Sequence, residues 1–128
     1  MAHHGLPTDG WELRGEDTIE FGRRASHELL DRGEPPSALL CVSDTVAMGA
    51  LHALVERGVH PGPHGIAVVG FDDSMAAQLV PPGLTSLRQP MEQIGVEVVR
   101  LLKDRLELVT SDKPHVILAP ELVVRGST

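Results

Sequence analysis

The sequence predicts an α/β protein whose open, mainly parallel sheet is flanked by helices. Two apolar runs, ALLCV at 38–42 and IAVVGF at 66–71, show no polar alternation. Such runs are typical of strands buried on both faces of a parallel sheet. Helical patterns alternate with them along the chain, as in right-handed βαβ units. The 128 residues suit one domain with a real core.

Turn and cap signals delimit the elements of the first half. The predicted elements are a short strand at 11–14, a helix at 18–32, a strand at 38–42 and a helix at 43–57. Gly33 ends the first helix and Pro35-Pro36 forbids its continuation. Ser43 is placed to cap the second helix, which stops at Gly58.

The second half continues the alternation. The predicted elements are strand 66–71, short helix 74–79, weak strand 85–87, helix 91–107, and strands 116–118 and 122–124. The helix at 91–107 has the clearest periodicity. Its apolar stripe consists of Met91, Ile94, Val98, Leu101, Leu102 and Leu106.

Composition excludes several classes of protein. Eleven Lys and Arg face eighteen Asp and Glu, so the net charge is −7. A chain this acidic has no electrostatic footprint for nucleic acid or for an anionic membrane surface. Cys41 is the single cysteine and lies inside an apolar strand, where a thiol is usually inert. We expect no disulfide, no metal, no cofactor and no membrane partner.

Polar side chains follow the predicted strands, at the edge where parallel sheets bind ligands. Ser43 and Asp44 follow one strand, Asp72 and Asp73 the next, and Glu16 and Asp17 the first. Ser43 and Asp44 also suit a helix N-terminus, where they serve as caps. Asp72 is not needed as a cap, because Asp73 or Ser74 can cap the short helix that follows. Its carboxylate can therefore accept hydrogen bonds from hydroxyls or hold a metal.

Catalytic alternatives find little support in the sequence. A magnesium-dependent phosphoacceptor site requires a lysine at another strand end, but Lys103 and Lys113 lie in a helix and a turn. The glycines do not follow the G-x-G-x-x-G spacing, and no G-x-S-x-G elbow is present. A small magnesium-dependent enzyme that uses the strand-end carboxylates remains the alternative of another class.

Four segments together carry a family resemblance. They are PSALLCVSDTVAMGAL at 36–51, IAVVGFDD at 66–73, PP-LTSLRQP between 81 and 90, and LAPELVVRGS at 118–127. In this order they resemble the P-T-A…N-D-x-x-A-x-G, S-V-V-G-F-D-D, P-P-L-T-T-V-R-Q-P and L-P-P-E-L-V-V-R-x-S segments of the LacI/GalR family of bacterial transcriptional repressors. The resemblance runs from about Gly10 to the end.

The resemblance implies the C-terminal part of an effector-binding core with a periplasmic-binding-protein-like fold. It places residues 1–87 and 113–128 in the C-terminal lobe, and 88–112 in a crossover that packs on an N-terminal lobe. It implies a cytoplasmic dimer that senses a sugar or related polyol. Operator DNA is then bound only through a headpiece missing from this chain. A fragment of a periplasmic sugar-binding protein is the alternative.

Site residues follow from the resemblance position by position. Asp72 is an effector contact that accepts hydrogen bonds from ligand hydroxyls. Ser43 stands where the family usually has Asn, and Asp17 stands where many relatives place a stacking aromatic. Gln89 and Met91 lie where the chain crosses between lobes and face the cleft.

Two further expectations concern contacts between chains. Met48 and Val55 fall off the core stripe of the second helix. The resemblance makes them a dimer contact, shared with Gln78, Leu79 and Val80. The stripe of helix 91–107 lacks its family partner, so we expect that helix to dock on its own lobe or to pack between chains.

Overall fold

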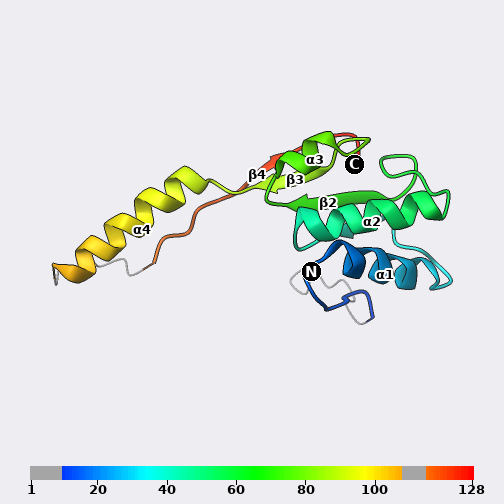
Figure 1. Ribbon diagram of the computed structural model, residues 1–128, viewed down its shortest axis with the longest axis horizontal. Helices are drawn as coiled ribbons and strands as arrows, with labels where there is room; N and C mark the ends of the chain where they lie inside the picture. The colour runs from blue at the N-terminus through cyan, green and yellow to red at the C-terminus, as the bar shows by residue number, and fades with distance from the viewer. Residues whose placement is uncertain (1–9, 108–114) are drawn as a thin grey trace.

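The computed structural model describes residues 10–107 and 115–128 and has the predicted α/β class. Its elements are α1 (Ile19–Leu30), β1 (Ala38–Leu40), α2 (Asp44–Glu56), β2 (Ala67–Phe71), α3 (Met75–Leu79), β3 (Thr85–Arg88), α4 (Met91–Leu106) and β4 (Glu121–Val123). The sheet order is β1-β2-β3-β4 (Figure 1). The first three strands are parallel and β4 is antiparallel to β3, which confirms an open, mainly parallel sheet.

Side-chain caps fix where the three helices of the sheet body begin. Thr18 accepts a hydrogen bond from the Phe21 N–H and starts α1. Ser43 accepts from the Val46 N–H at 3.1 Å and starts α2, as predicted. Ser74 caps α3 in the same way. These caps satisfy N–H groups that have no partner within the helix.

The core lies between the sheet and the α1–α2 layer. Leu54 of α2, Val68 of β2 and Leu84 before β3 are fully buried. The two helices approach closely because each carries a glycine at the crossing. A methyl group on Gly22 would overlap the carbonyl of Val46. One on Gly49 would overlap the carbonyl of Ile19.

Two predicted strands are wrong. Residues 11–14 and 116–118 form no strand, and the last strand begins at Glu121, one residue earlier than predicted. A strand needs a neighbour that offers free backbone groups. Among the described residues, β1 pairs with β2 only, and residues 116–118 lead back from α4 outside the sheet.

The expectation that the apolar strands are buried on both faces is also wrong. Leu39 is buried, but Leu40 is 67% exposed and Val42 is 75% exposed. In β2, buried and half-buried residues alternate. Helix α2 packs on β2 and α1 packs on α2, whereas α4 stands away from the sheet (Figure 1).

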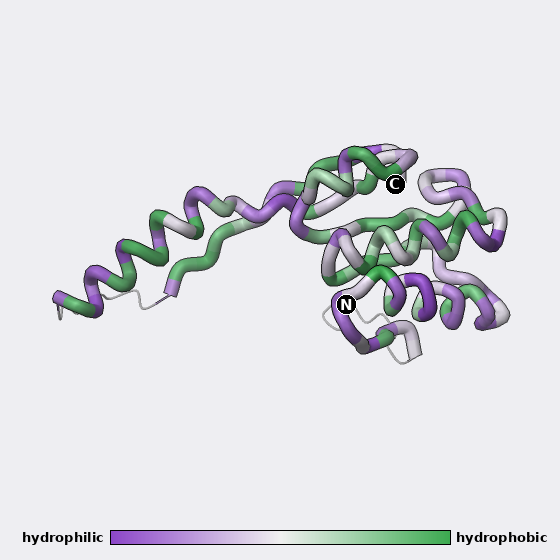
Figure 2. The backbone as a smooth tube through the Cα atoms, in the orientation of Figure 1, coloured by the Kyte–Doolittle hydropathy of each residue, from purple (hydrophilic) through white to green (hydrophobic). Residues whose placement is uncertain are grey.

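Helix α4 stands away from the sheet body at the end of an extended connection (Figure 1). None of its residues is buried, and Met91, Val98, Leu102 and Leu106 of the predicted stripe are exposed. Figure 2 shows the hydrophobic residues that run along α4 and the returning segment. Docking of α4 on its own lobe is therefore wrong, and packing between chains stays a prediction. Within the described residues, no helix is long and apolar enough to cross a bilayer.

Candidate functional site

The candidate site is the edge of the sheet at the carboxyl ends of β1 and β2. These strands are parallel neighbours, with Leu40 opposite Val69. The loops that follow them therefore leave the sheet at the same edge. A hydrogen bond joins the two loops, because the Ser74 N–H donates to Asp44 Oδ2 at 2.6 Å.

Asp72 presents an exposed carboxylate at this edge. Its Oδ1 accepts from Gln89 Nε2 at 2.7 Å, so two of the predicted site residues are in contact. Its backbone N–H donates to the Leu87 carbonyl at 2.9 Å. The φ angle of Asp72 is 110° and that of Asp73 is 52°, both in the region that L-residues rarely adopt. Such strain persists only where the surroundings enforce it, and it concentrates at functional sites.

Asp73 turns its carboxylate inward, into the protein. Its side chain is only 3% exposed, and it accepts from Arg125 Nη2 at 2.5 Å and from Arg88 Nε at 2.7 Å. Burial alone would raise the pKa of this carboxyl, but the hydrogen bonds and charges of Arg125 and Arg88 outweigh burial. The pKa of Asp73 is therefore held below its usual range.

Asp44 does not act as the cap of α2, because Ser43 has that role. Its buried carboxylate accepts from the Ser86 hydroxyl at 2.6 Å as well as from the Ser74 N–H. Ser86 in turn accepts from the Asp73 N–H at 3.0 Å. Asp44 thus stabilises the loop that carries Asp72 through hydrogen bonds to Ser74 and Ser86. Because its carboxylate is buried, it is not available to a ligand.

The Ser43 hydroxyl is used twice within the protein. It accepts a hydrogen bond from the Val46 N–H and donates one to the Asp17 carboxylate. Ser43 is also buried, whereas Asp17 is exposed. At this position of the edge, the group that faces solvent is therefore the Asp17 carboxylate, carried on the chain just before α1.

The remaining predicted residues have separate positions. Met91 is exposed at the first turn of α4. In the proposed dimer set, Met48 and Val80 are half-buried, while Val55, Gln78 and Leu79 are exposed. These five residues belong to α2, to α3 and to the residue after α3.

Sequence reasoning missed the support beneath Asp72. The missed residues are Ser86, Arg88 and Arg125, together with the inward orientation of Asp73 and the bridging role of Asp44. One signal was available. Arg88 and Arg125 each follow a predicted strand, and the acidic pair Asp72-Asp73 follows a third. A buried carboxylate needs such cationic partners.

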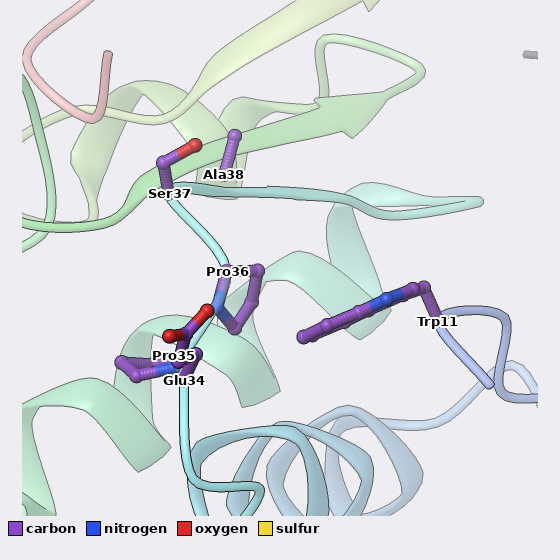
Figure 3. A pocket seen from close by; sticks show the side chains of 6 residues that line it. All are labelled: Trp11, Glu34, Pro35, Pro36, Ser37 and Ala38. Carbon is purple, nitrogen blue, oxygen red and sulfur yellow. The ribbon is translucent and has the colours of Figure 1, made fainter. Parts of the chain in front are cut away.

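A shallow hollow lies at the opposite end of β1. It is lined by Trp11, Glu34, Pro35, Pro36, Ser37 and Ala38. Figure 3 shows the Trp11 ring directed toward Pro36 across this hollow. Ser37 and Ala38 stand at the start of β1, so the hollow is separate from the strand-end edge.

The chemistry of the edge is that of hydrogen-bond acceptance. No group of three or more His, Cys, Asp or Glu in residues 10–107 and 115–128 is placed to hold a metal ion. The carboxylates of Asp44 and Asp73 are buried, whereas Asp72 and Asp17, each with one protein donor, also face solvent. Burial raises the pKa of Cys41 to about 12, so its thiol is protonated at neutral pH.

Known proteins share this sequence and fold. Residues 1–128 match the periplasmic binding protein-like domain. The HTH-type transcriptional repressor CytR of Escherichia coli (strain K12) is 36% identical over 115 residues, which cover 90% of this chain and 33% of CytR. The chain thus spans about a third of that relative.

Two solved structures are also similar. A regulatory protein of the LacI family from Chloroflexus aggregans is 38% identical with a TM-score of 0.88, covering 99% of this chain and 46% of that one. The transcriptional regulator CelR, solved as a complex with cellobiose, is 36% identical with a TM-score of 0.84. The match covers 99% of this chain and 39% of the CelR chain. The chain therefore belongs to the family of periplasmic binding protein-like domains, in the form found in LacI-family regulators.

Proposed function

We propose that this chain is the ligand-sensing part of a LacI-type transcriptional regulator, and that its effector is a sugar or related polyol. In this proposal, Asp72 is the principal contact and accepts hydrogen bonds from ligand hydroxyls. Asp17 and Gln89 add polar contacts, Ser43 positions Asp17, and Met91 borders the ligand from the crossover. The cellobiose complex of CelR supports a sugar as the ligand class.

One observation carries the proposal. Asp72 adopts a φ angle of 110°, and the turn is held by the Leu87 carbonyl and by the Ser86 hydroxyl under Asp73. Backbone strain of this kind costs about 1–3 kcal/mol, which is offset elsewhere in the fold. The strained turn leaves the Asp72 carboxylate exposed at the edge where α/β sheets bind ligands.

The proposal divides the chain into a body and a crossover. In this proposal the C-terminal lobe comprises residues 1–87 and 113–128, and residues 88–112 pack on an N-terminal lobe. Residues 1–9 and 108–114 of these ranges lie outside the described part of the chain. The exposed apolar residues of α4 support this division, because each such side chain gains about 1.5–3 kcal/mol when it is buried. Operator DNA is then bound by a separate headpiece of a cytoplasmic regulator.

We also propose a homodimer through Met48, Val55, Gln78, Leu79 and Val80. Val55 and Leu79 support it, because both are largely exposed aliphatic side chains. Sedimentation of the Leu79→Glu and Leu102→Glu variants separates two arrangements. Dissociation by Leu79→Glu alone supports the α2–α3 contact, whereas dissociation by Leu102→Glu alone means that α4 packs between chains.

The ligand proposal is tested by thermal shift with a panel of sugars and polyols that includes cellobiose. A ligand stabilises the folded chain in proportion to the logarithm of its concentration above Kd, so millimolar concentrations reveal weak binding. We expect stabilisation of the natural chain and none of Asp72→Asn. The Asp31→Asn variant is the matched control, since Asp31 pairs with Arg57 at the end of α1.

The same assay separates the enzyme alternative. Magnesium chloride is included as a probe. Stabilisation by magnesium that Asp72→Asn abolishes, without stabilisation by any sugar, would favour the magnesium-dependent enzyme over the sensor. The positions of Asp44 and Asp73, both already bound by protein donors, favour the sensor.

A further inference from the structure

The carboxylate of Asp73 connects three parts of the chain that sequence separates. It belongs to the loop after β2, directly beside Asp72. Its Oδ2 accepts from Arg88, the last residue of β3, from which the chain leaves toward α4. Its Oδ1 accepts from Arg125, which lies just after β4, the strand on which the chain returns. Asp73 thus binds the point from which the chain leaves for α4 and, through Arg125, the segment that follows β4.

The two arginines are anchored to different degrees. Arg125 is mostly buried and donates from Nη1 to the Leu84 carbonyl at 2.7 Å. Arg88 is 48% exposed and also contacts Glu121, its antiparallel partner at the start of β4, at 3.3 Å. The contact of Asp73 with Arg125 therefore fixes the loop to the body. Its contact with Arg88 fixes the departing chain.

The carboxylate of Asp73 is buried, which favours its pairing with both arginines. Removing a charge from water is costly unless the charge is paired and hydrogen-bonded, so Asp73 stays bound to both guanidinium groups. The Asp73 N–H is held by Ser86, and Ser86 is held by Asp44. The loop therefore has a rigid base on the β2 side.

We propose that Asp73 is a positioning residue that couples the Asp72 turn to the direction in which α4 leaves the sheet. Asp73 itself does not touch the ligand. The coupling rests on the proposed ligand-sensing function for its biological use, but the orientation of α4 by Asp73 exists without ligand. A ligand that shifts Asp72 changes the strength of the Asp73–Arg88 contact and so the orientation of α4.

Pulsed electron-electron resonance measures this orientation in the whole chain. Nitroxide labels are placed at His52→Cys on α2 and Lys103→Cys on α4, in a Cys41→Ser background. Both label sites are exposed. The Asp73→Asn variant removes the charge that holds the two guanidinium groups. We expect the width of its distance distribution to be at least double that of the labelled parent, while far-ultraviolet circular dichroism is unchanged.

A milder pair of variants covers the case in which Asp73→Asn does not fold. Arg88→Gln removes only the attachment to the departing chain, and we expect broadening in the same direction. Arg57→Gln is the matched control, because Arg57 is 40% exposed and also pairs with an aspartate at 2.7 Å. Arg57 lies after α2, so its removal should leave the width unchanged. Equal widths for Arg88→Gln and Arg57→Gln would overturn the proposal.

A purely stabilising role for Asp73 predicts a different result. The variants would then unfold at lower temperature but keep the parental distance distribution while folded, and that result also overturns the proposal. Cellobiose is added as a final probe. A shift in the parent that is lost in Asp73→Asn supports the coupling to ligand. If cellobiose shifts no protein, the ligand proposal fails for this sugar, while the ligand-free contrast still decides the role of Asp73.

Discussion

The Ser86→Ala substitution tests the support beneath the Asp72 turn. Ser86 is fully buried, and its hydroxyl both donates to Asp44 at 2.6 Å and accepts from the Asp73 N–H at 3.0 Å. A hydrogen bond to a charged group contributes about 1.5–3 kcal/mol, and an unpaired buried N–H costs about 1 kcal/mol or more. We therefore expect a loss of about 2–4 kcal/mol, equivalent to roughly 10 °C in Tm.

Urea unfolding followed by circular dichroism measures this loss. Ser74→Ala is the matched control, because it also removes a serine hydroxyl, from the loop after β2 rather than from β3. Ser74 Oγ only caps α3, where it accepts from the Ala77 N–H at 3.3 Å. Loss of such a cap costs about 1 kcal/mol. If Ser86→Ala costs no more stability than Ser74→Ala, the buried hydrogen bonds from Asp44 through Ser86 to Asp73 do not support the turn.

Three other outcomes follow from the described contacts. In a denaturant titration, Gly49→Ala should lower the free energy of unfolding by about 1–3 kcal/mol, because the added methyl group overlaps α1. Gly95→Ala is the control, because its methyl group lies in open space on α4 and should be neutral or stabilising. Cys41, with a pKa of about 12, should react with a disulfide reagent at pH 8 far more slowly in the folded chain than in urea. Because the pKa of Asp73 lies below its ordinary 3.8, its stabilising contribution is complete above about pH 4 and lost at lower pH. The difference in urea midpoint between the natural chain and Asp73→Asn should therefore be constant from pH 7 to about pH 4 and shrink below it.

The sequence predicted those elements whose signals are local. Ser43 and Gly58 mark the ends of the second helix, and the apolar runs at 38–42 and 66–71 contain β1 and β2. Residues 11–14 and 116–118 have strand-like composition, but pairing depends on a neighbour that local sequence does not describe. Burial of Leu40 and Val42 likewise depends on what covers the second face of the sheet.

The candidate site was predictable in position but not in detail. Asp72 follows an apolar strand, which is enough to place it at the ligand edge. The inward turn of Asp73 depends on Arg88 and Arg125, which lie 15 and 52 residues away in sequence. The redirection of Ser43 toward Asp17 depends on how the chain before α1 passes the start of α2. Both are products of tertiary packing.

Nuclear magnetic resonance of the isotopically labelled chain, titrated with cellobiose and related sugars, shows whether a ligand binds at Asp72. We expect amide shifts at Asp72, Gln89 and Asp17, with no shift of the Trp11 indole in the hollow at the far end of β1. Asp72→Asn should abolish those shifts. Shifts that cluster at Trp11, or shifts at the strand-end edge that survive Asp72→Asn, would mean that Asp72 is not the effector contact.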